Sequence, residues 1–272
     1  MSTVMAGPYA ESLAETAAFE ETRFDASELL QRRHYDKIAE EYETHYGDSC
    51  SREYRRRFLY EPMFIGLNLE GRKVLDAMCG SGHTTEYLLS CGAEVTGLDI
   101  SPEEINRFRS RCADARGICR SLLDSKLDSE SFDCVAVVGG LHHLHPHLDT
   151  AIREIHRVLK PGGYFCFMEP HARSIPNLVR RFWYRFDNLF SENEAAIDIA
   201  YLKREFSEQF TFTHTKYSGN VAFLFVLNSL IFRLPLKAKR IYSPPLMTCE
   251  AAIGVLQSRL TACFAVAQWR KK

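Results

Sequence analysis

The stretch VLDAMCGSGHTTEYL, residues 74–88, decides the fold because it joins a short apolar run, a glycine turn and a helical pattern. This order is typical of the first βαβ unit of a parallel sheet, where backbone N–H groups of the turn approach a ligand. Gly80 and Gly82 allow that close approach. Met78 stands where an earlier glycine is common, and a methionine there predicts a backbone φ below zero and a side chain packed beside the ligand or under the N-terminal helix.

Short apolar segments recur along the chain and alternate with helical patterns. Buried strands separated by helices indicate a parallel sheet covered on both faces. We therefore expect an α/β fold with a Rossmann-like, seven-stranded, mostly parallel sheet and helices on both faces. The predicted strands are residues 73–77, 94–98, 117–119, 134–138, 164–170, 211–217 and 262–268.

Helix-breaking residues set several predicted boundaries. Lys-Pro-Gly-Gly at 160–163 should end a helix over 148–159 before the fifth strand begins. Residues 218–261, between the last two strands, are far too many for a hairpin loop of 2–5 residues, so they predict a helical cap over the sheet rim. Ser-Pro-Pro at 243–245 should break that helical segment. Further helices are expected over 52–65, 174–186 and 195–208.

The charge of the chain is balanced overall but not locally. A formal net charge of −1 gives no sign of nucleic-acid binding. Residues 171–272 hold fifteen Lys and Arg against seven Asp and Glu. This excess is compatible with ordinary solvated charge, or with a face toward an anionic substrate or surface, including peripheral lipid contact.

Cysteine usage and hydropathy predict a cytoplasmic protein. The nine cysteines form no CxxC pair and several lie in apolar runs, as free thiols in a reducing compartment do. The longest apolar run, residues 221–232, is shorter than the roughly 20 residues that span a bilayer, so no transmembrane segment is expected. The histidines lack zinc-site spacing, and we expect no metal.

The glycine loop favours a ligand other than a dinucleotide. Gly80 and Gly82 fit the first two positions of G-x-G-x-x-G, but Thr85 occupies the third. That third glycine allows the close helix–strand packing typical of pyrophosphate sites. Asp76 in front of the loop suits a ligand that carries an amino group. An NAD(P)-dependent oxidoreductase nevertheless stays open as an alternative.

Four motifs in order, VLDAMCGSG, VTGLDIS, SFDCVAVVGGLHHL and REIHRVLKPGGYFCFMEP, carry a family resemblance. The chain resembles the class I S-adenosylmethionine-dependent methyltransferases of the small-molecule group, similar to methyltransferase types 11 and 25, over roughly residues 35–170. The resemblance implies S-adenosyl-L-methionine as cofactor, S-adenosyl-L-homocysteine as product and no nucleic-acid partner.

The resemblance also implies roles for individual residues. Asp76 would lie near the methionine ammonium, and Asp99 would accept hydrogen bonds from both ribose hydroxyls. Ser121 departs from an acidic residue that many members use to hold the adenine amino group. The implied cofactor-binding residues are Tyr35, Tyr42, Asp76, Met78, Gly80, Gly82, Asp99, Ile100, Leu122, Leu123, Val138 and Gly139.

The resemblance divides the chain into regions with different tasks. Residues 1–27 would be a flexible N-terminus and 28–66 helices that cover the cofactor. Residues 67–217 and 262–272 would form the methyltransferase core, and 218–261 a helical cap that binds substrate.

The implied reaction is an in-line methyl transfer to a small-molecule acceptor through O, N or C. The aromatic and basic C-terminal part predicts an apolar or aromatic acceptor, with an anionic group or lipid character as an option. His143 and His142 are the candidates for a general base, because imidazole titrates near neutral pH. Packing or hydrogen bonding is the plainer role for this pair. A protein that uses the same cofactor for a reaction other than methyl transfer is a further alternative.

Overall fold

A computed structural model describes residues 43–183, 195–232 and 234–272. Their centre is one seven-stranded sheet with strand order β3-β2-β1-β4-β5-β7-β6. Strands β1 to β5 pair in parallel, whereas β7 pairs antiparallel with both β5 and β6, so six strands share one direction and β7 runs the other way. The strands are β1 Lys73–Ala77, β2 Glu94–Asp99, β3 Arg116–Cys119, β4 Phe132–Val138, β5 Leu159–Pro170, β6 Phe210–Ser218 and β7 Phe264–Lys271. The expected Rossmann-like, mostly parallel sheet is confirmed.

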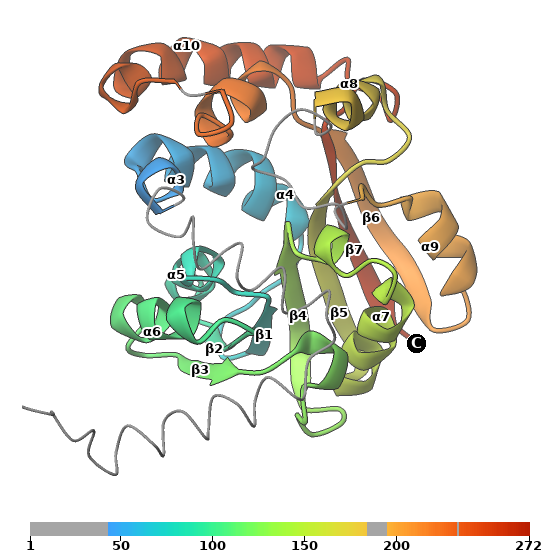
Figure 1. Cartoon of the computed structure of the whole chain (residues 1–272). Helices are drawn as coiled ribbons and strands as arrows, with labels where there is room; N and C mark the ends of the chain where they lie inside the picture. The colour runs from blue at the N-terminus through green and yellow to red at the C-terminus, as the bar shows by residue number, and fades with distance from the viewer. Residues whose placement is uncertain (1–42, 184–194, 233) are drawn as a thin grey trace, which may run out of the picture.

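Helices cover both faces of this sheet (Figure 1). The α-helices are α3 Ser49–Arg55, α4 Glu61–Met63, α5 His83–Ser90, α6 Pro102–Arg111, α7 Leu148–Val158, α8 Ile175–Trp183, α9 Ile199–Glu205 and α10 Leu236–Gly254. The shorter 3₁₀ and π turns are η1 Arg56–Tyr60, η2 Leu122–Asp124, η3 Leu141–His143 and η4 Phe223–Leu227.

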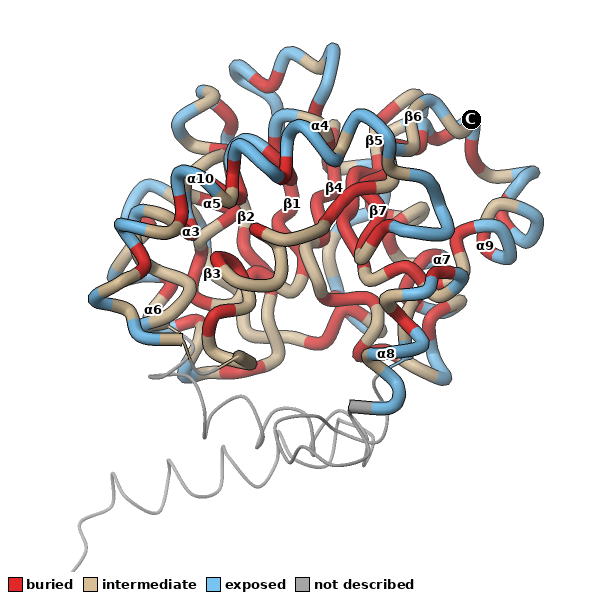
Figure 2. The backbone as a smooth tube through the Cα atoms, turned by 90° about the horizontal axis from the view of Figure 1, so that it is seen from above, coloured by how far each residue is buried: buried red, intermediate tan, exposed pale blue. Residues whose placement is uncertain are grey.

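Alternation along the strands divides the core into two layers. Val135 and Val137 pack with residues of α7 and α9 on one face, whereas Cys134 and Ala136 pack with α3, α5 and η4 on the other. Successive side chains of a strand point to opposite faces, so an apolar strand serves both layers. Figure 2 shows the buried residues along the strands and the exposed ones on the outer sides of the helices.

The prolines at 244 and 245 do not break the cap helix, so the expected break at 243–245 is wrong. Helix α10 runs through both of them from Leu236 to Gly254. Each proline removes one hydrogen bond, to the carbonyl four residues earlier. Those carbonyls belong to Arg240 and Ile241, both exposed, so water can replace the missing donors.

The fifth strand begins earlier than expected. The residues of Lys-Pro-Gly-Gly at 160–163 lie inside β5, directly after α7, rather than forming a turn before it. A register irregularity between Phe132 and Cys134 in the β4–β5 pairing accommodates them. The expected helix over 52–65 is divided into α3, η1 and α4. The expected helix over 174–186 is described as far as Trp183, and its last residues lie outside the described part.

Buried polar contacts join α3 to α10. Lys239 Nζ on α10 lies 2.5 Å from Asp48 Oδ2 and 2.7 Å from Ser51 Oγ. Tyr54 on α3 donates a hydrogen bond to Glu250 across 2.9 Å, and both side chains are buried. Among the described residues, no helix has the length and apolar character to cross a membrane.

Candidate functional site

The loop after β1 has a left-handed backbone at three of its residues. φ is +59° at Met78, +50° at Gly80 and +94° at Gly82. The expected negative φ at Met78 is therefore wrong. The methionine is held there by packing: a Cβ added at Gly140 would lie 2.8 Å from Met78 Sδ. Glycine at 140 thus makes room for a methionine in a strained conformation.

Asp76, at the end of β1, is buried against the helix that follows the loop. Thr85 Oγ1 donates to Asp76 Oδ2 across 2.7 Å. Burial raises the pKa of Asp76 to about 7, although the Thr85 hydrogen bond acts in the opposite direction. The position of the missing third glycine is therefore occupied by a hydroxyl that holds this carboxyl group.

Asp99, at the end of the neighbouring strand β2, lines a pocket beside the loop. Its Oδ2 accepts the N–H of Gly80 across 2.8 Å, and its Oδ1 accepts the N–H of Ser101 across 3.0 Å. A carboxylate has two acceptor oxygens, and each can accept more than one hydrogen bond. The pocket is lined by Met78, Leu98, Asp99, Ile100, Arg120, Ser121, Leu122 and Leu144.

Leu122 and Leu123 differ in position although the sequence groups them. Leu122 is a buried core residue that also lines the pocket, whereas the partly buried Leu123 packs against the same core and is not part of the pocket lining. Ser121 Oγ accepts the Leu123 N–H across 3.0 Å, so this amide is already used within the turn.

The end of β4 leaves open space above its backbone. Val138 ends the strand, and Gly139 has φ of +67°. A Cβ at Gly139 would meet nothing within 4 Å. The Gly139 N–H is taken by the Met168 carbonyl at 2.8 Å, so this peptide is held while its outer side stays open. The space above Gly139 and the pocket beside Asp99 both lie at the carboxyl ends of the strands.

A buried carboxyl group at the end of β5 organises the turn after β4. Glu169 accepts the N–H groups of Gly140 and Leu141 at 2.9 and 2.7 Å. Its Oε2 also lies 2.8 Å from Nδ1 of His142. Burial raises the pKa of Glu169 to about 8, against the effect of the backbone donors. Burial lowers the pKa of His142 well below its usual range, with Arg180 acting in the same direction.

The two candidate histidines have different surroundings. The rings of His142 and His143 lie 3.8 Å apart between centroids. His142 is the histidine that contacts Glu169. His143 is buried, with 6% of its surface exposed. No group of three or more His, Cys, Asp or Glu residues with metal-site geometry occurs among the described residues.

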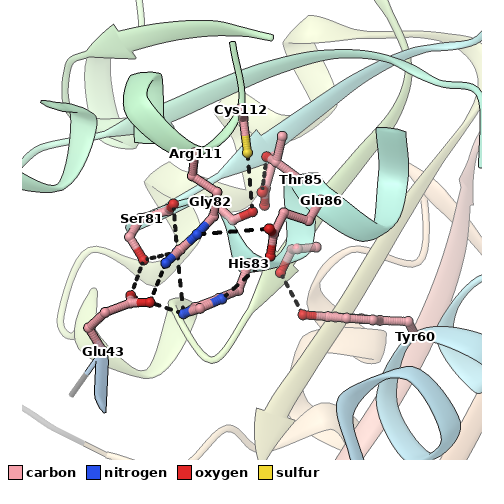
Figure 3. Close-up of polar contacts among 11 residues, drawn as sticks. Glu43, Tyr60, Ser81, Gly82, His83, Thr85, Glu86, Arg111 and Cys112 are labelled. Atoms are coloured by element: carbon pink, nitrogen blue, oxygen red, sulfur yellow. Dashed lines mark hydrogen bonds and ion pairs between the residues drawn. The ribbon is translucent and has the colours of Figure 1, made fainter. Parts of the chain in front are cut away.

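A polar network on the outer side of the loop was not expected from the sequence (Figure 3). Arg111 Nη1 donates to the carbonyl and hydroxyl oxygens of Ser81 at 2.9 and 2.7 Å. Arg111 also pairs with Glu43, which accepts from Ser81 Oγ across 3.0 Å and lies 3.2 Å from His83 Nε2. Burial, followed by Arg55 and Arg111, lowers the pKa of His83 to about 3, so the ring is neutral.

This network links three distant parts of the chain to one loop residue. Glu43 precedes α3, Ser81 lies in the loop, and Arg111 ends α6. No local periodicity connects these positions, and only the fold brings them together. Tyr35 and Tyr42, predicted to cover the cofactor, lie outside the described residues.

The central part of the chain matches a known family. Residues 75–167, about a third of the chain, match the family model described as methyltransferase domain. An uncharacterized methyltransferase of Synechocystis is 39% identical over 105 residues, which are 38% of this chain and 50% of the relative. A fatty-acid O-methyltransferase of Mycolicibacterium smegmatis is 34% identical over 127 residues, 45% of this chain and 46% of the relative. The chain spans about half the length of the curated relatives that it matches.

Solved structures share the fold. One is described as an S-adenosylmethionine-dependent methyltransferase, possible histamine N-methyltransferase, from Thermotoga maritima. It has a TM-score of 0.60 at 17% identity and covers 88% of this chain and 99% of its own. Residues 75–167 thus carry a methyltransferase domain, and the chain shares the fold of this solved structure.

Proposed function

We propose that this chain, whose residues 75–167 match a methyltransferase domain, transfers a methyl group from S-adenosylmethionine to a small-molecule acceptor. The observation that carries the proposal is the pair of carboxyl groups at the ends of adjacent strands, with the glycine loop between them. Asp76 and Asp99 end β1 and β2, and Gly80 binds Asp99 through its N–H. Ligands of such sheets bind outside the carboxyl ends of the strands.

The two carboxyl groups would recognise opposite parts of the cofactor. Asp99 would accept hydrogen bonds from the ribose hydroxyls, and Ile100 and Leu122 would pack on the adenine from the same pocket. Asp76 would face the methionine ammonium, directly or through water. The backbone of 78–82, with Val138 and Gly139, would line the methionine and ribose. Tyr35 and Tyr42 would cover the site from the N-terminal helices, residues 28–66.

The bound cofactor supplies a methyl group activated by a positively charged sulfur. The residues of the chain have to hold the acceptor in line with that methyl group at near-contact distance. Residues 218–261 are proposed as the cap that closes over the acceptor, with 67–217 and 262–272 as the core. A hydroxyl or amine acceptor also has to lose a proton during transfer.

His142 is the better placed of the two candidate bases. When Glu169 is ionised, His142 donates its Nδ1–H to the carboxylate, and Nε2 keeps a lone pair that can take a proton from the acceptor. When Glu169 is protonated, the carboxyl donates to Nδ1 and Nε2 carries the proton instead. The deprotonated pair is therefore the active form. His143 stays the second candidate, since it packs directly against His142.

The acceptor is proposed to be apolar or aromatic, with an anionic group as an option. The basic excess of residues 171–272 supports the anionic part. A relative described as a fatty-acid O-methyltransferase supports the apolar part.

Titration calorimetry with S-adenosylhomocysteine, S-adenosylmethionine and NADH tests the cofactor assignment. We expect binding of the first two and none of NADH, and weaker binding by Asp99→Asn. Incubation with methyl-labelled cofactor and a fractionated metabolite extract then tests transfer. Binding of NADH instead would favour an oxidoreductase. Cofactor binding without label transfer to any fraction would favour a different reaction.

A further inference from the structure

Helix α8 exposes its apolar side. The exposed fractions are 59% for Ile175, 62% for Leu178, 61% for Val179 and 67% for Phe182. These positions follow i, i+3, i+4 and i+7 spacing and form one stripe along the helix. A surface helix ordinarily turns such a stripe toward the core, so the orientation of α8 is inverted.

Polar side chains fix α8 in this orientation. Ser174 and Asn177 are buried under the helix. Ser174 Oγ donates to the His171 carbonyl at 3.2 Å, and Asn177 Nδ2 donates to the Ala172 carbonyl at 2.8 Å. Rotating α8 so that the stripe faces inward would break these hydrogen bonds and place the apolar side chains against the polar rim. The outward stripe therefore belongs to the folded state.

A second apolar segment lies next to α8. Val255 and Leu256, directly after α10, are 83% and 87% exposed, and Leu260 is 56% exposed. The Ile175 N–H donates to the Leu260 carbonyl at 2.8 Å, which ties the start of α8 to this segment. Figure 1 draws α8 beside the chain that leads from α10 into β7. We call the stripe and residues 255–260 together the apolar platform.

The two chain segments that form the apolar platform carry only positive charges. Residues 172–183 and 251–263 contain no Asp or Glu. Arg181 and Arg259 are exposed within these segments, while Arg173 pairs with Asp198 at 2.7 Å. An apolar face bordered by arginines matches the boundary of a bilayer with anionic headgroups. A second copy fits less well, because a self-complementary contact would bring the same arginines together without a carboxylate.

We propose that the apolar platform docks on an anionic lipid surface. The side chains of α8 and residues 255–260 insert among the headgroups, and Arg181 and Arg259 contact lipid phosphates. The contact deepens the proposed function, since an apolar acceptor would concentrate in that surface close to the sheet rim. The supply of acceptor from the lipid surface rests on the proposed function, whereas docking itself requires no catalysis.

Vesicle flotation of the full chain tests the inference. The probes are phosphatidylcholine vesicles with and without phosphatidylglycerol, at low and high salt. One variant, Phe182→Ser with Leu256→Ser, removes apolar contacts, and another, Arg181→Glu with Arg259→Glu, reverses the charge. Ile241→Ser is the matched control, because Ile241 is 80% exposed on α10 but lies outside the apolar platform.

We expect binding to the anionic vesicles that weakens with salt and falls about tenfold in each double variant. The control should bind like the wild type. Absence of wild-type binding, or binding by both double variants as strong as that of the wild type, would overturn the inference. So would a dimer in light scattering that Phe182→Ser with Leu256→Ser converts to a monomer. Calorimetry with S-adenosylhomocysteine on the same samples reports separately on the proposed function.

Discussion

The Thr85 hydroxyl lies 2.7 Å from Oδ2 of Asp76 and donates a hydrogen bond to it. Both residues are buried, and the bond spans from the end of β1 to the first turn of α5. Thr85 occupies the place of the third glycine in a dinucleotide loop. A threonine there does not allow the close helix–strand packing of such a loop, but its hydroxyl fixes the Asp76 carboxyl group. That carboxyl group leads to the first prediction.

Cofactor affinity should rise with pH as the pH approaches 7. The pKa of Asp76 is raised to about 7 in the ligand-free protein, so the carboxyl is mostly protonated below that value. A cationic ammonium favours the ionised form, and binding at lower pH should therefore release a proton. Calorimetry in buffers of different ionisation enthalpy measures this release. The Asp76→Asn variant should bind the cofactor more weakly, and its affinity should no longer depend on pH in this range. If the affinity of the variant keeps this pH dependence, Asp76 is not its source.

Methyl transfer should rise with pH to about 8 if the Glu169–His142 pair acts as the base. Burial raises the pKa of Glu169 to about 8, and only the deprotonated pair can accept a proton through His142. Glu169→Gln should lower the rate by roughly 100-fold, as loss of a general base does, and remove this rise.

The two histidine variants separate the candidates in the same assay. His142→Gln should lose the activity while cofactor affinity in calorimetry stays close to that of the wild type. If His143→Gln loses the activity and His142→Gln keeps it, the base is His143.

Gly82→Ala should disturb the loop far more than Gly66→Ala. Both glycines have positive φ, +94° and +73°, so both substitutions strain the backbone by about 1 kcal/mol. At Gly82 the added Cβ would also lie 2.9 Å from Cys112 Sγ and 3.0 Å from Phe108, while at Gly66 it meets nothing within 4 Å. We expect losses of about 2–4 kcal/mol and about 1 kcal/mol in urea unfolding. Equal losses would contradict the crowding at Gly82.

Arg111→Met should weaken cofactor binding about tenfold, because Arg111 holds the Ser81 carbonyl and hydroxyl in the loop. Arg109→Met on the same helix is the control, since Arg109 donates to the Gly117 carbonyl instead. Calorimetry with S-adenosylhomocysteine compares them. A loss of the same size in both would mean that α6 as a whole, rather than the Ser81 contact, supports the loop.

The strands and the two carboxyl groups of the site could be predicted because their signals are local. A buried parallel strand is a short apolar run, and Asp76 and Asp99 lie at the ends of two such runs. The backbone at Met78 could not be predicted, since a methionine ordinarily has a negative φ and the space for its side chain is left by Gly140, distant in the sequence. Helix α10 continues through Pro244 and Pro245, and the residues whose carbonyls lose a donor, Arg240 and Ile241, are exposed, which a rule on proline alone does not include.

The remaining misses involve contacts between distant segments. Glu43 and Arg111 are 68 residues apart and meet only in the folded chain. The register of β5 against β4 places Glu169 under the turn that carries His142, and this register was not visible from composition or periodicity. Polar residues that follow no repeat give no pattern in the sequence, so their contacts cannot be predicted until the strand order is known.

The bonds between α3 and α10 have a consequence for local unfolding. Lys239 and Glu250 are buried charged groups whose partners, Asp48 and Tyr54, belong to the other segment. Detaching either helix would break both of these buried contacts, so the two should open together as one cooperative unit. Amide hydrogen exchange would then report a common opening free energy for the two helices, although Asp48 and Lys239 are 191 residues apart in the sequence.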